Sequence, residues 1–269
     1  LPFPISHTYG GNSSCVELDI GTEGYVLCDL GTGVRPFGLH VLARKGPHAR
    51  CTFHVFMSHL HWDHIMGFPF FPHAYIPGNR IVIYGCHDGI EEAFRRQHAA
   101  PCFPVDFTRL PAKIEFVKLE PGKRSRHAGL DVTPMLQLHS GDSYGYRFEH
   151  GGKVVVYSTD SEHKNEDTAS TQDVVRFFRD ADLVIFDAMY SLADTVSVKE
   201  DWGHSSNVMG VELCQHARAK HLCIYHHEPV YDDAKIASVL KETLRLEEIT
   251  REGHTLRISS AYDGLEIAV

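Results

Sequence analysis

The stretch HLHWDH at 59–64 places four metal-binding side chains within six positions, directly after a short apolar run. We expect that run to be a β-strand, and alternate residues of a strand point the same way, so His59 and His61 can converge on one ion. Asp63 and His64 lie past the turn and can address a neighbouring ion. An incidental surface cluster is the alternative, but ligand-type residues at this density on the tip of a strand favour a metal site.

Three later ligand-type residues also follow apolar strand-like runs: His139 after VTPMLQL, Asp160 after VVVYST and His226 after LCIY. Taken alone each is weak evidence, because a lone histidine at a strand end is more often a surface residue. Together they supply imidazoles for two ions and a carboxylate that can bridge them. Two ions about 3.5–4 Å apart can hold the attacking and leaving oxygens of a displacement. His227 competes with His226 for the ligand role, and we favour His226 because it immediately follows the strand.

We expect these residues to be positioned by short strands. Glycine-containing turns separate the strands in the first half of the chain, and helices alternate with them in the second half. The patterns predict a hairpin around the turn GTEG and a proline-rich surface loop at 99–112. Neither a repeat nor a linker separates the halves, so we expect one domain, 1–269, with helices on both faces of a β core. Because the chain starts without Met or a leading strand, we expect a few residues upstream. The predicted strands are 16–19, 25–28, 54–57, 81–85, 114–118, 130–138, 144–149, 153–157, 183–187 and 222–225, and the predicted helices are 37–44, 90–98, 171–178, 206–219 and 232–246.

The amino-acid composition limits which binding partners and which cellular compartment we expect for this protein. Twenty of 269 residues are histidine, and the formal net charge is −9. This charge argues against broad binding to nucleic acid or to anionic membranes, and no run approaches the roughly 18 apolar residues of a membrane helix. The seven cysteines are widely spaced without a C-x-x-C pair, which favours free thiols in a reducing compartment. No signal peptide is visible, and we expect a cytoplasmic protein. The basic stretch at 123–126 is interpreted as a solvated loop.

On the strength of the H-x-H-x-D-H stretch and the later His139, Asp160 and His226, the chain resembles the metallo-β-lactamase superfamily from about Tyr9 to its end. The resemblance implies an α/β fold, a four-layer αββα sandwich with the metal site at one edge of the two β-sheets. Members that do redox chemistry at two irons usually carry Glu where this chain has His61, so hydrolysis is favoured. An imidazole-rich set suits zinc, with manganese or iron as alternatives. The family pattern assigns His59, His61 and His139 to one ion, Asp63, His64 and His226 to the other, and Asp160 to both.

Two further stretches look like ribonuclease Z-like phosphodiesterases: HSGDSYGYR at 139–147 and WGHSS at 202–206. In those enzymes a Glu pairs with the His of an H-S-T element, and that His is assigned a proton-transfer role. Here the pair would be Asp187 and His204, with Asp in place of Glu. This role also follows from the residue types without the resemblance, because an imidazole paired with a carboxylate can stay cationic and protonate a leaving alkoxide. The alternative is that GHSS only caps a helix, through Ser205 or Ser206, and that Asp187 is a strand-end carboxylate.

Taken with YGGNSSC at 9–15, DLGTG at 29–33, GFPFF at 67–71 and STD at 158–160, the resemblance is nearest to a bacterial group related to ribonuclease Z and to the cyclic-phosphate diesterase of phosphonate catabolism. We expect the glycines of these stretches to form turns, and at least two of the rings Phe68, Phe70, Phe71 and Tyr75 to pack in the core.

The leading hypothesis is therefore a binuclear metal phosphodiesterase acting on small or cyclic phosphodiesters. Metal-activated hydroxide would attack phosphorus, and His204 backed by Asp187 would protonate the leaving oxygen. Asp63 would have two roles, one as a metal ligand and one as a catalytic residue. A tRNA 3′-processing endonuclease is the alternative, weakened by the negative charge and by the lack of a Lys-rich arm in the sequence. Hydrolysis of a lactone, thioester or β-lactam would leave the Asp187–His204 pair without a purpose, and a degenerate non-enzyme would be expected to have lost ligands. A homodimer is left open.

Overall fold

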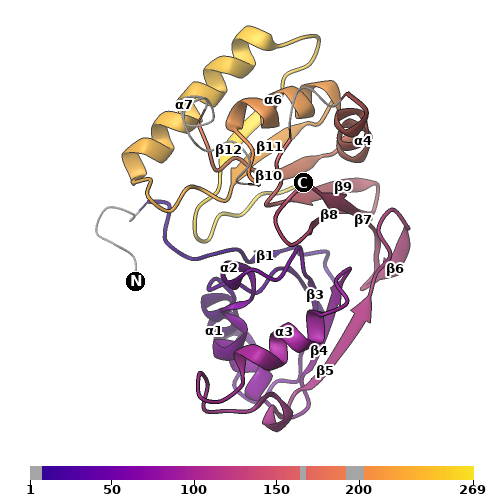
Figure 1. Cartoon of the computed structure of the whole chain (residues 1–269), viewed down its shortest axis with the longest axis vertical. Helices are drawn as coiled ribbons and strands as arrows, with labels where there is room; N and C mark the ends of the chain where they lie inside the picture. The colour runs from indigo at the N-terminus through magenta and orange to yellow at the C-terminus, as the bar shows by residue number, and fades with distance from the viewer. Residues whose placement is uncertain (1–7, 164–167, 192–202) are drawn as a thin grey trace. The chain divides into compact units, whose positions relative to one another are not determined.

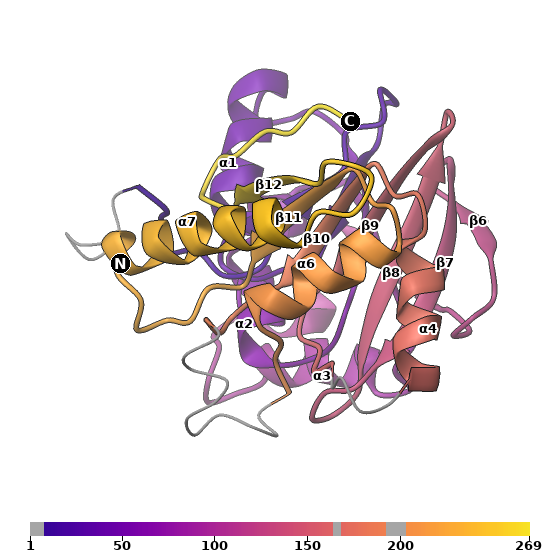
Figure 2. The ribbon, with the colours of Figure 1, turned by 90° about the horizontal axis from the view of Figure 1, so that it is seen from above.

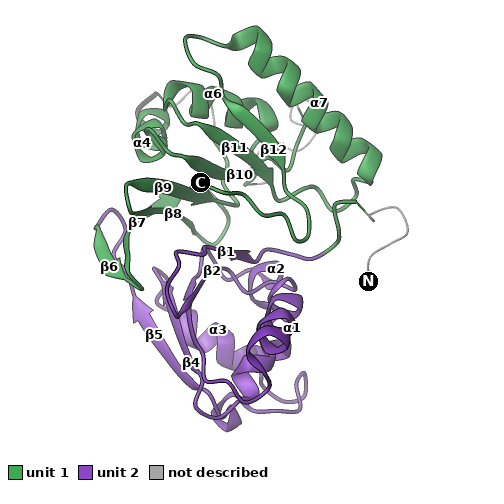
Figure 3. Ribbon diagram, turned by 180° about the vertical axis from the view of Figure 1, so that it is seen from behind, with its two compact units in different colours: residues 1–11, 124–269 green, residues 12–123 purple. Residues whose placement is uncertain are grey.

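The computed structural model describes residues 8–163, 168–191 and 203–269. The chain divides into two compact units, residues 12–123 and residues 1–11 with 124–269, drawn in purple and green in Figure 3. Each unit contains one β-sheet and its own hydrophobic core. The single domain expected over 1–269 stays a prediction.

The unit of residues 12–123 is built on a five-stranded mixed sheet with the order β1-β2-β3-β4-β5. The first two strands form the expected antiparallel hairpin, and the remaining neighbours are parallel. Strand β4 is a continuous apolar run, which is the pattern of a parallel strand covered on both faces. The strands are β1 Val16–Glu17, β2 Tyr25–Cys28, β3 Thr52–Phe56, β4 Arg80–Gly85 and β5 Lys113–Lys118.

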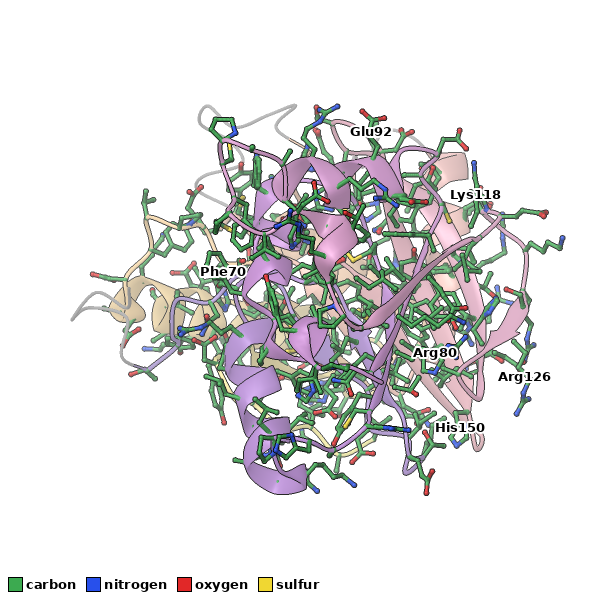
Figure 4. The ribbon with its side chains drawn as sticks, turned by 90° about the horizontal axis from the view of Figure 1, so that it is seen from below. Phe70, Arg80, Glu92, Lys118, Arg126 and His150 are labelled. Atoms are coloured by element: carbon green, nitrogen blue, oxygen red, sulfur yellow. The ribbon has the colours of Figure 1, made fainter. Side chains whose placement is uncertain are left out.

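Helices and short 3-10 turns connect these strands (Figure 1). The α3 sequence IEEAFRRQ buries Ile90 and Phe94, while i,i+4 pairs of glutamate and arginine lie on its exposed side. Phe68 and Phe71 are fully buried and Phe70 is exposed, which confirms the packing expected of these rings (Figure 4). The elements are α1 Val34–Lys45, α2 Trp62–Ile65, α3 Ile90–Gln97, η1 Phe68–Phe70, η2 Pro72–Tyr75 and η3 Phe107–Arg109.

The other unit is built on a seven-stranded mixed sheet with the order β12-β11-β10-β9-β8-β7-β6. Strands β9 to β12 are parallel, and β6 to β9 pair antiparallel. Because parallel strands end at the same edge, the residues that follow β9, β10 and β11 are brought near one another. The strands are β6 Ser125–His127, β7 Leu130–Gln137, β8 Ser143–His150, β9 Lys153–Ser158, β10 Leu183–Asp187, β11 His221–Tyr225 and β12 Arg257–Ser260.

Three helices lie along one face of this sheet (Figure 2): α4 Thr168–Phe178, α6 Asn207–His216 and α7 Asp233–Thr250. Two of them begin at side-chain caps that the sequence carries. Ser206 accepts a hydrogen bond from the backbone N–H of Met209, and Asp232 accepts one from that of Lys235.

All the predicted strands and helices are present, with ends shifted by a few residues. The strands β6 and β12 and the short helix α2 were not predicted. Placing residues 123–126 in a solvated loop was partly wrong, because Ser125 and Arg126 pair with β7 in strand β6. Their side chains remain at the surface, as Arg126 shows in Figure 4.

Two further observations concern the cysteines and the hydropathy of the helices. All seven cysteines are free thiols, and five of them are buried. Among the residues that the structure describes, no helix combines the length and apolarity needed to cross a bilayer.

Candidate metal centre

The histidines of the 59–64 stretch follow β3 and are fixed by a buried carboxylate, Asp29, at the end of β2. Nδ1 of His64 lies 2.8 Å from Oδ2 of Asp29, and both side chains are fully buried. The backbone N–H and the hydroxyl of Ser58 donate to the same carboxylate, each at 2.7 Å. Asp29 thereby ties the start of this stretch to its end.

Backbone hydrogen bonds join the 59–67 region to residues 29–33, and a glycine in the latter segment allows the two backbones to approach closely. The N–H of Leu30 donates to the carbonyl of His64 at 2.8 Å, and the N–H of Gly67 donates back to Leu30 at 2.9 Å. A Cβ on Gly31 would overlap the carbonyl oxygen of Asp63. Gly31 is therefore required for close approach, beyond the turn that we expected of it.

The imidazoles of this unit present a donor set suited to a metal. The His59 ring lies 4.6 Å from His61 and 4.1 Å from His64 between centroids. Nδ1 of His59 faces the Ser58 hydroxyl at 3.0 Å, and Nδ1 of His64 faces Asp29, so Nε2 is the nitrogen of each ring that could hold a metal ion. Nε2 of His64 also lies 3.2 Å from Oδ2 of Asp63. Imidazoles oriented by outer carboxylates and hydroxyls are typical of metal sites.

In the other unit, the Asp160 carboxylate lies between two imidazoles. Its Oδ2 is 3.9 Å from Nε2 of His139, and its Oδ1 is 3.4 Å from Nε2 of His226. Asp160 and His226 both have left-handed backbone conformations, with φ of 41° and 59°. Such conformations are uncommon outside glycine and cluster at functional sites. Each carboxylate oxygen faces a different histidine, which is the arrangement a bridging ligand needs.

The backbone of Gly203 fixes the tautomer of His139. The carbonyl of Gly203 lies 2.8 Å from Nδ1 of His139, so Nδ1 carries the proton and Nε2 is the nitrogen that could hold a metal ion. Gly203 has a φ of 81°, and a Cβ there would overlap the His139 ring. Glycine is thus needed at 203 for two reasons, its backbone conformation and its contact with His139.

The neighbouring histidines 226 and 227 differ in their surroundings. Nε2 of His227 lies 3.1 Å from both the carbonyl of Ala261 and the hydroxyl of Ser260. Ligand atoms of His226, Asp187 and His204 lie within 4.8 Å of one another. These contacts favour His226 over His227 as the ligand-type residue.

The predicted pair of Asp187 and His204 forms although Asp is shorter than Glu. Oδ2 of Asp187 lies 2.8 Å from Nδ1 of His204, and the carboxylate is fully buried. The backbone N–H groups of Ser161 and Met189 also donate to Asp187, at 3.0 and 3.1 Å. The His204 ring stacks on His226 with 5.2 Å between centroids and an interplanar angle of 15°. The pair therefore lies beside the Asp160 cluster of the same unit.

The charge around His204 favours its protonated form. Burial acts to lower the pKa of His204, but the hydrogen bond and charge of Asp187, together with the charge of Asp160, outweigh burial and raise that pKa. His204 can therefore hold a proton for delivery to a leaving group.

Two residues with a positioning role were absent from the sequence-based assignments, Asp29 and Gly203. The signal for Asp29 was its place after the apolar strand YVLC, the same context that identified Asp160. Of the WGHSS stretch, Trp202 lies outside the described residues. Ser206 caps α6, whereas the Ser205 hydroxyl donates to the carbonyl of Ser161 at 2.6 Å.

The comparisons with known proteins agree on one family. Residues 25–227 match the family model of the beta-lactamase superfamily domain. Ribonuclease BN of Proteus mirabilis is 26% identical over 239 residues, which cover 70% of this chain and 75% of that protein. The metallo-β-lactamase fold protein YhfI from Bacillus subtilis has a TM-score of 0.69 at 19% identity, covering 97% of this chain and 95% of that one. Yeast PDE1 has a TM-score of 0.70 at 16% identity, with 95% and 94% covered.

The predicted family and fold class are thus confirmed, with two mixed sheets and helices. The fold implies divalent metals, typically zinc, and the histidine and aspartate donors of each unit fit that requirement. The chain belongs to the metallo-β-lactamase superfamily of hydrolases.

Proposed function

We propose that this protein is a metal-dependent phosphodiesterase that acts on small or cyclic phosphodiesters with two divalent ions, zinc being the best match to the donor set. The observation that carries the proposal is the hydrogen bond between the buried Asp187 and the partly buried His204, whose ring stacks on that of His226. The proposed ligands are those of the family pattern: His59, His61, Asp63, His64, His139, Asp160 and His226.

The reaction needs a proton at the leaving oxygen, which the chain can supply. Bound divalent ions would polarise the phosphoryl group and favour ionisation of water. Asp187 holds Nδ1 of His204 and favours the imidazolium, so Nε2 carries the proton available for the leaving alkoxide.

Endonucleolytic cleavage of precursor tRNA is a second candidate, supported by the similarity to ribonuclease BN over 70% of this chain. The net charge of −9 opposes it, since affinity for an RNA backbone depends on neutralising phosphates with Lys and Arg. Small phosphodiesters require no such basic surface, so we favour them.

Hydrolysis of bis-p-nitrophenyl phosphate by protein loaded with Zn²⁺ or Mn²⁺ tests the proposal. We expect activity that is abolished in His61→Ala and reduced about 10²- to 10⁴-fold in His204→Ala. His216→Ala, an exposed histidine at the end of α6, is the matched control and should keep full activity. A metal-loaded sample that opens lactones or nitrocefin but leaves phosphodiesters intact would contradict the proposal, and cleavage of precursor tRNA at its 3′ end would favour the second candidate.

A further inference from the structure

The ring of His204 has to be held in one orientation if it is to deliver a proton. Its hydrogen bond to Asp187 fixes the position of Nδ1, but a single hydrogen bond lets the ring pivot about that atom. The direction of Nε2, which would carry the proton, therefore depends on the side chains that pack against the ring. The His204 side chain is only 13% exposed, so such packing covers most of it.

Three aromatic rings among the described residues of this unit lie against His204. The His226 ring stacks on it with 5.2 Å between centroids, and the His139 ring lies at 5.1 Å with an interplanar angle of 66°. The third ring is that of Tyr190, at 5.9 Å and 86°, which is an edge-to-face arrangement within the usual range of aromatic pairs. His139 and His226 are proposed metal ligands. Tyr190 is therefore the one of the three rings whose task is not to bind an ion.

The backbone of Tyr190 is joined to the segment that directly follows His204. The N–H of Tyr190 donates to the carbonyl of Ser205 at 3.2 Å, and its carbonyl accepts from the N–H of Asn207 at 3.1 Å. These hydrogen bonds form a parallel β-bridge. Asp187, which holds Nδ1 of His204, lies only three residues before Tyr190. The end of β10 and the residues after it thus hold His204 in three ways, through a carboxylate, a backbone bridge and a ring.

Tyr190 is too deeply buried to touch a substrate itself. The residue is only 1% exposed, and burial, with the charge of Glu228 adding to it, raises the pKa of Tyr190 to about 12. Its hydroxyl therefore keeps its proton near pH 7 and is a poor acid. Any effect of Tyr190 on the reaction has to pass through a neighbour, and the neighbour with a proton to deliver is His204.

We propose that Tyr190 is a positioning residue for His204, because its ring forms a wall that stops the imidazole from pivoting and keeps Nε2 directed at the leaving oxygen. The inference rests on the proposed function for the role of His204 and adds to it a residue on which that role depends. A misplacement of about 1 Å can reduce a rate about 10²-fold, so loss of this wall should have a measurable effect.

Tyr190→Leu removes the ring, and two substrates show whether proton delivery is what suffers. Phenolate is a stronger base than p-nitrophenolate, so hydrolysis of diphenyl phosphate depends more on protonation of the leaving oxygen than hydrolysis of bis-p-nitrophenyl phosphate does. In the metal-loaded protein we expect Tyr190→Leu to lower kcat about tenfold for bis-p-nitrophenyl phosphate and about 10²-fold for diphenyl phosphate, with KM changed less than about threefold. Tyr190→Phe keeps the ring and should retain both rates within about threefold.

Phe178→Leu is the matched control for loss of a buried ring. Phe178 is fully buried in the same unit, and its ring contacts Phe186. Any loss of rate in Phe178→Leu should be equal for the two substrates. Tyr190→Met, whose flexible side chain adapts to irregular spaces, replaces Tyr190→Leu if that variant does not fold. Equal losses for both substrates in the Tyr190 variants, or a Tyr190→Phe protein as impaired as Tyr190→Leu, would refute the positioning role.

A measurement without substrate or metal separates failure of this inference from failure of the proposed function. In metal-free protein labelled with ¹⁵N at histidine, the NMR signals of the His204 ring are identified by their absence in His204→Ala. We expect one narrow set of these signals in the unchanged protein and in Tyr190→Phe, and broadened or doubled signals in Tyr190→Leu. That result supports the positioning role even if neither phosphodiester is hydrolysed, in which case only the proposed function falls. His204 signals that are identical in Tyr190→Leu and the unchanged protein would overturn the positioning role and leave the phosphodiesterase standing.

Discussion

Replacing Asp29 by asparagine tests how the fold prepares the histidines of the 59–64 stretch. The substitution keeps the shape of the side chain, and asparagine tolerates the left-handed conformation of this position, whose φ is 60°. It changes only the charge and one acceptor. Oδ2 of Asp29 receives hydrogen bonds from Nδ1 of His64 at 2.8 Å and from the Ser58 hydroxyl at 2.7 Å, while Oδ1 receives the Ser58 N–H.

The expected effect on metal binding follows from the tautomer of His64. If the amide oxygen of the introduced asparagine keeps the Ser58 N–H, the NH₂ group of that amide faces Nδ1 of His64, which must then act as the acceptor. The ring proton moves to Nε2, the atom proposed to bind the metal. Loss of such an outer-sphere partner reduces metal affinity about 10- to 100-fold. Loss of one charge-assisted hydrogen bond lowers the free energy of unfolding by about 1.5–3 kcal/mol.

Competition for Zn²⁺ with a chromophoric chelator measures the affinity, and urea unfolding followed by circular dichroism measures the stability. Asp106→Asn is the matched control, because Asp106 lies in the same unit, accepts from the Thr108 N–H at 2.9 Å and has no contact with the histidines of the 59–64 stretch. Its metal affinity should be unchanged. If Asp29→Asn loses stability but binds Zn²⁺ within about twofold of the unchanged protein, Asp29 is only a structural carboxylate and the tautomer argument is refuted.

Three further results are expected. Asp187→Asn should lower kcat for bis-p-nitrophenyl phosphate about 10²-fold or more and change KM only a few-fold, because the substitution removes the partner that keeps His204 protonated. Steady-state kinetics measure both constants, and an unchanged kcat would refute the role of His204 as the general acid. Burial, aided by the charge of Arg257, lowers the pKa of His221 from 6.5 to about 4. Between these pH values His221 is protonated in the unfolded chain but not in the folded one, so the free energy of unfolding falls as the pH drops from 6.5 to 4. Urea unfolding over that pH range should show a smaller decrease in the free energy of unfolding for His221→Gln than for the unchanged protein. An identical decrease in both proteins would contradict the lowered pKa of His221. Ser206→Ala should lower the free energy of unfolding by about 1 kcal/mol, because the hydroxyl caps α6, whereas Ser206→Asp should retain stability in the same urea experiment.

The elements that carry the candidate site were predictable because local pattern and burial agree in them. Strand β10, Leu183–Asp187, has the predicted bounds, and its four apolar residues are followed directly by the carboxylate of Asp187. Strands β6 and β12 were missed because each has only three or four residues, at least half of them polar. Such segments become strands when a longer neighbour supplies hydrogen bonds, as β7 and β11 do here. The loop at 99–112 was expected from its prolines, and it contains one short turn of 3-10 helix, η3.

The sequence by itself determined the family and the candidate ligands, because ligand-type residues at the ends of apolar strands are visible without knowledge of how those strands pair. Tertiary structure decided which atoms of those residues are prepared for chemistry. Asp29 and His64 are 35 positions apart, and His139 and Gly203 are 64 apart, so their hydrogen bonds leave no local pattern. The same holds for the two oxygens of Asp160, which face different histidines only because strands β7, β9 and β11 of one sheet end near one another. A ligand type is a property of one residue, but the orientation of its donor atom depends on its neighbours in space.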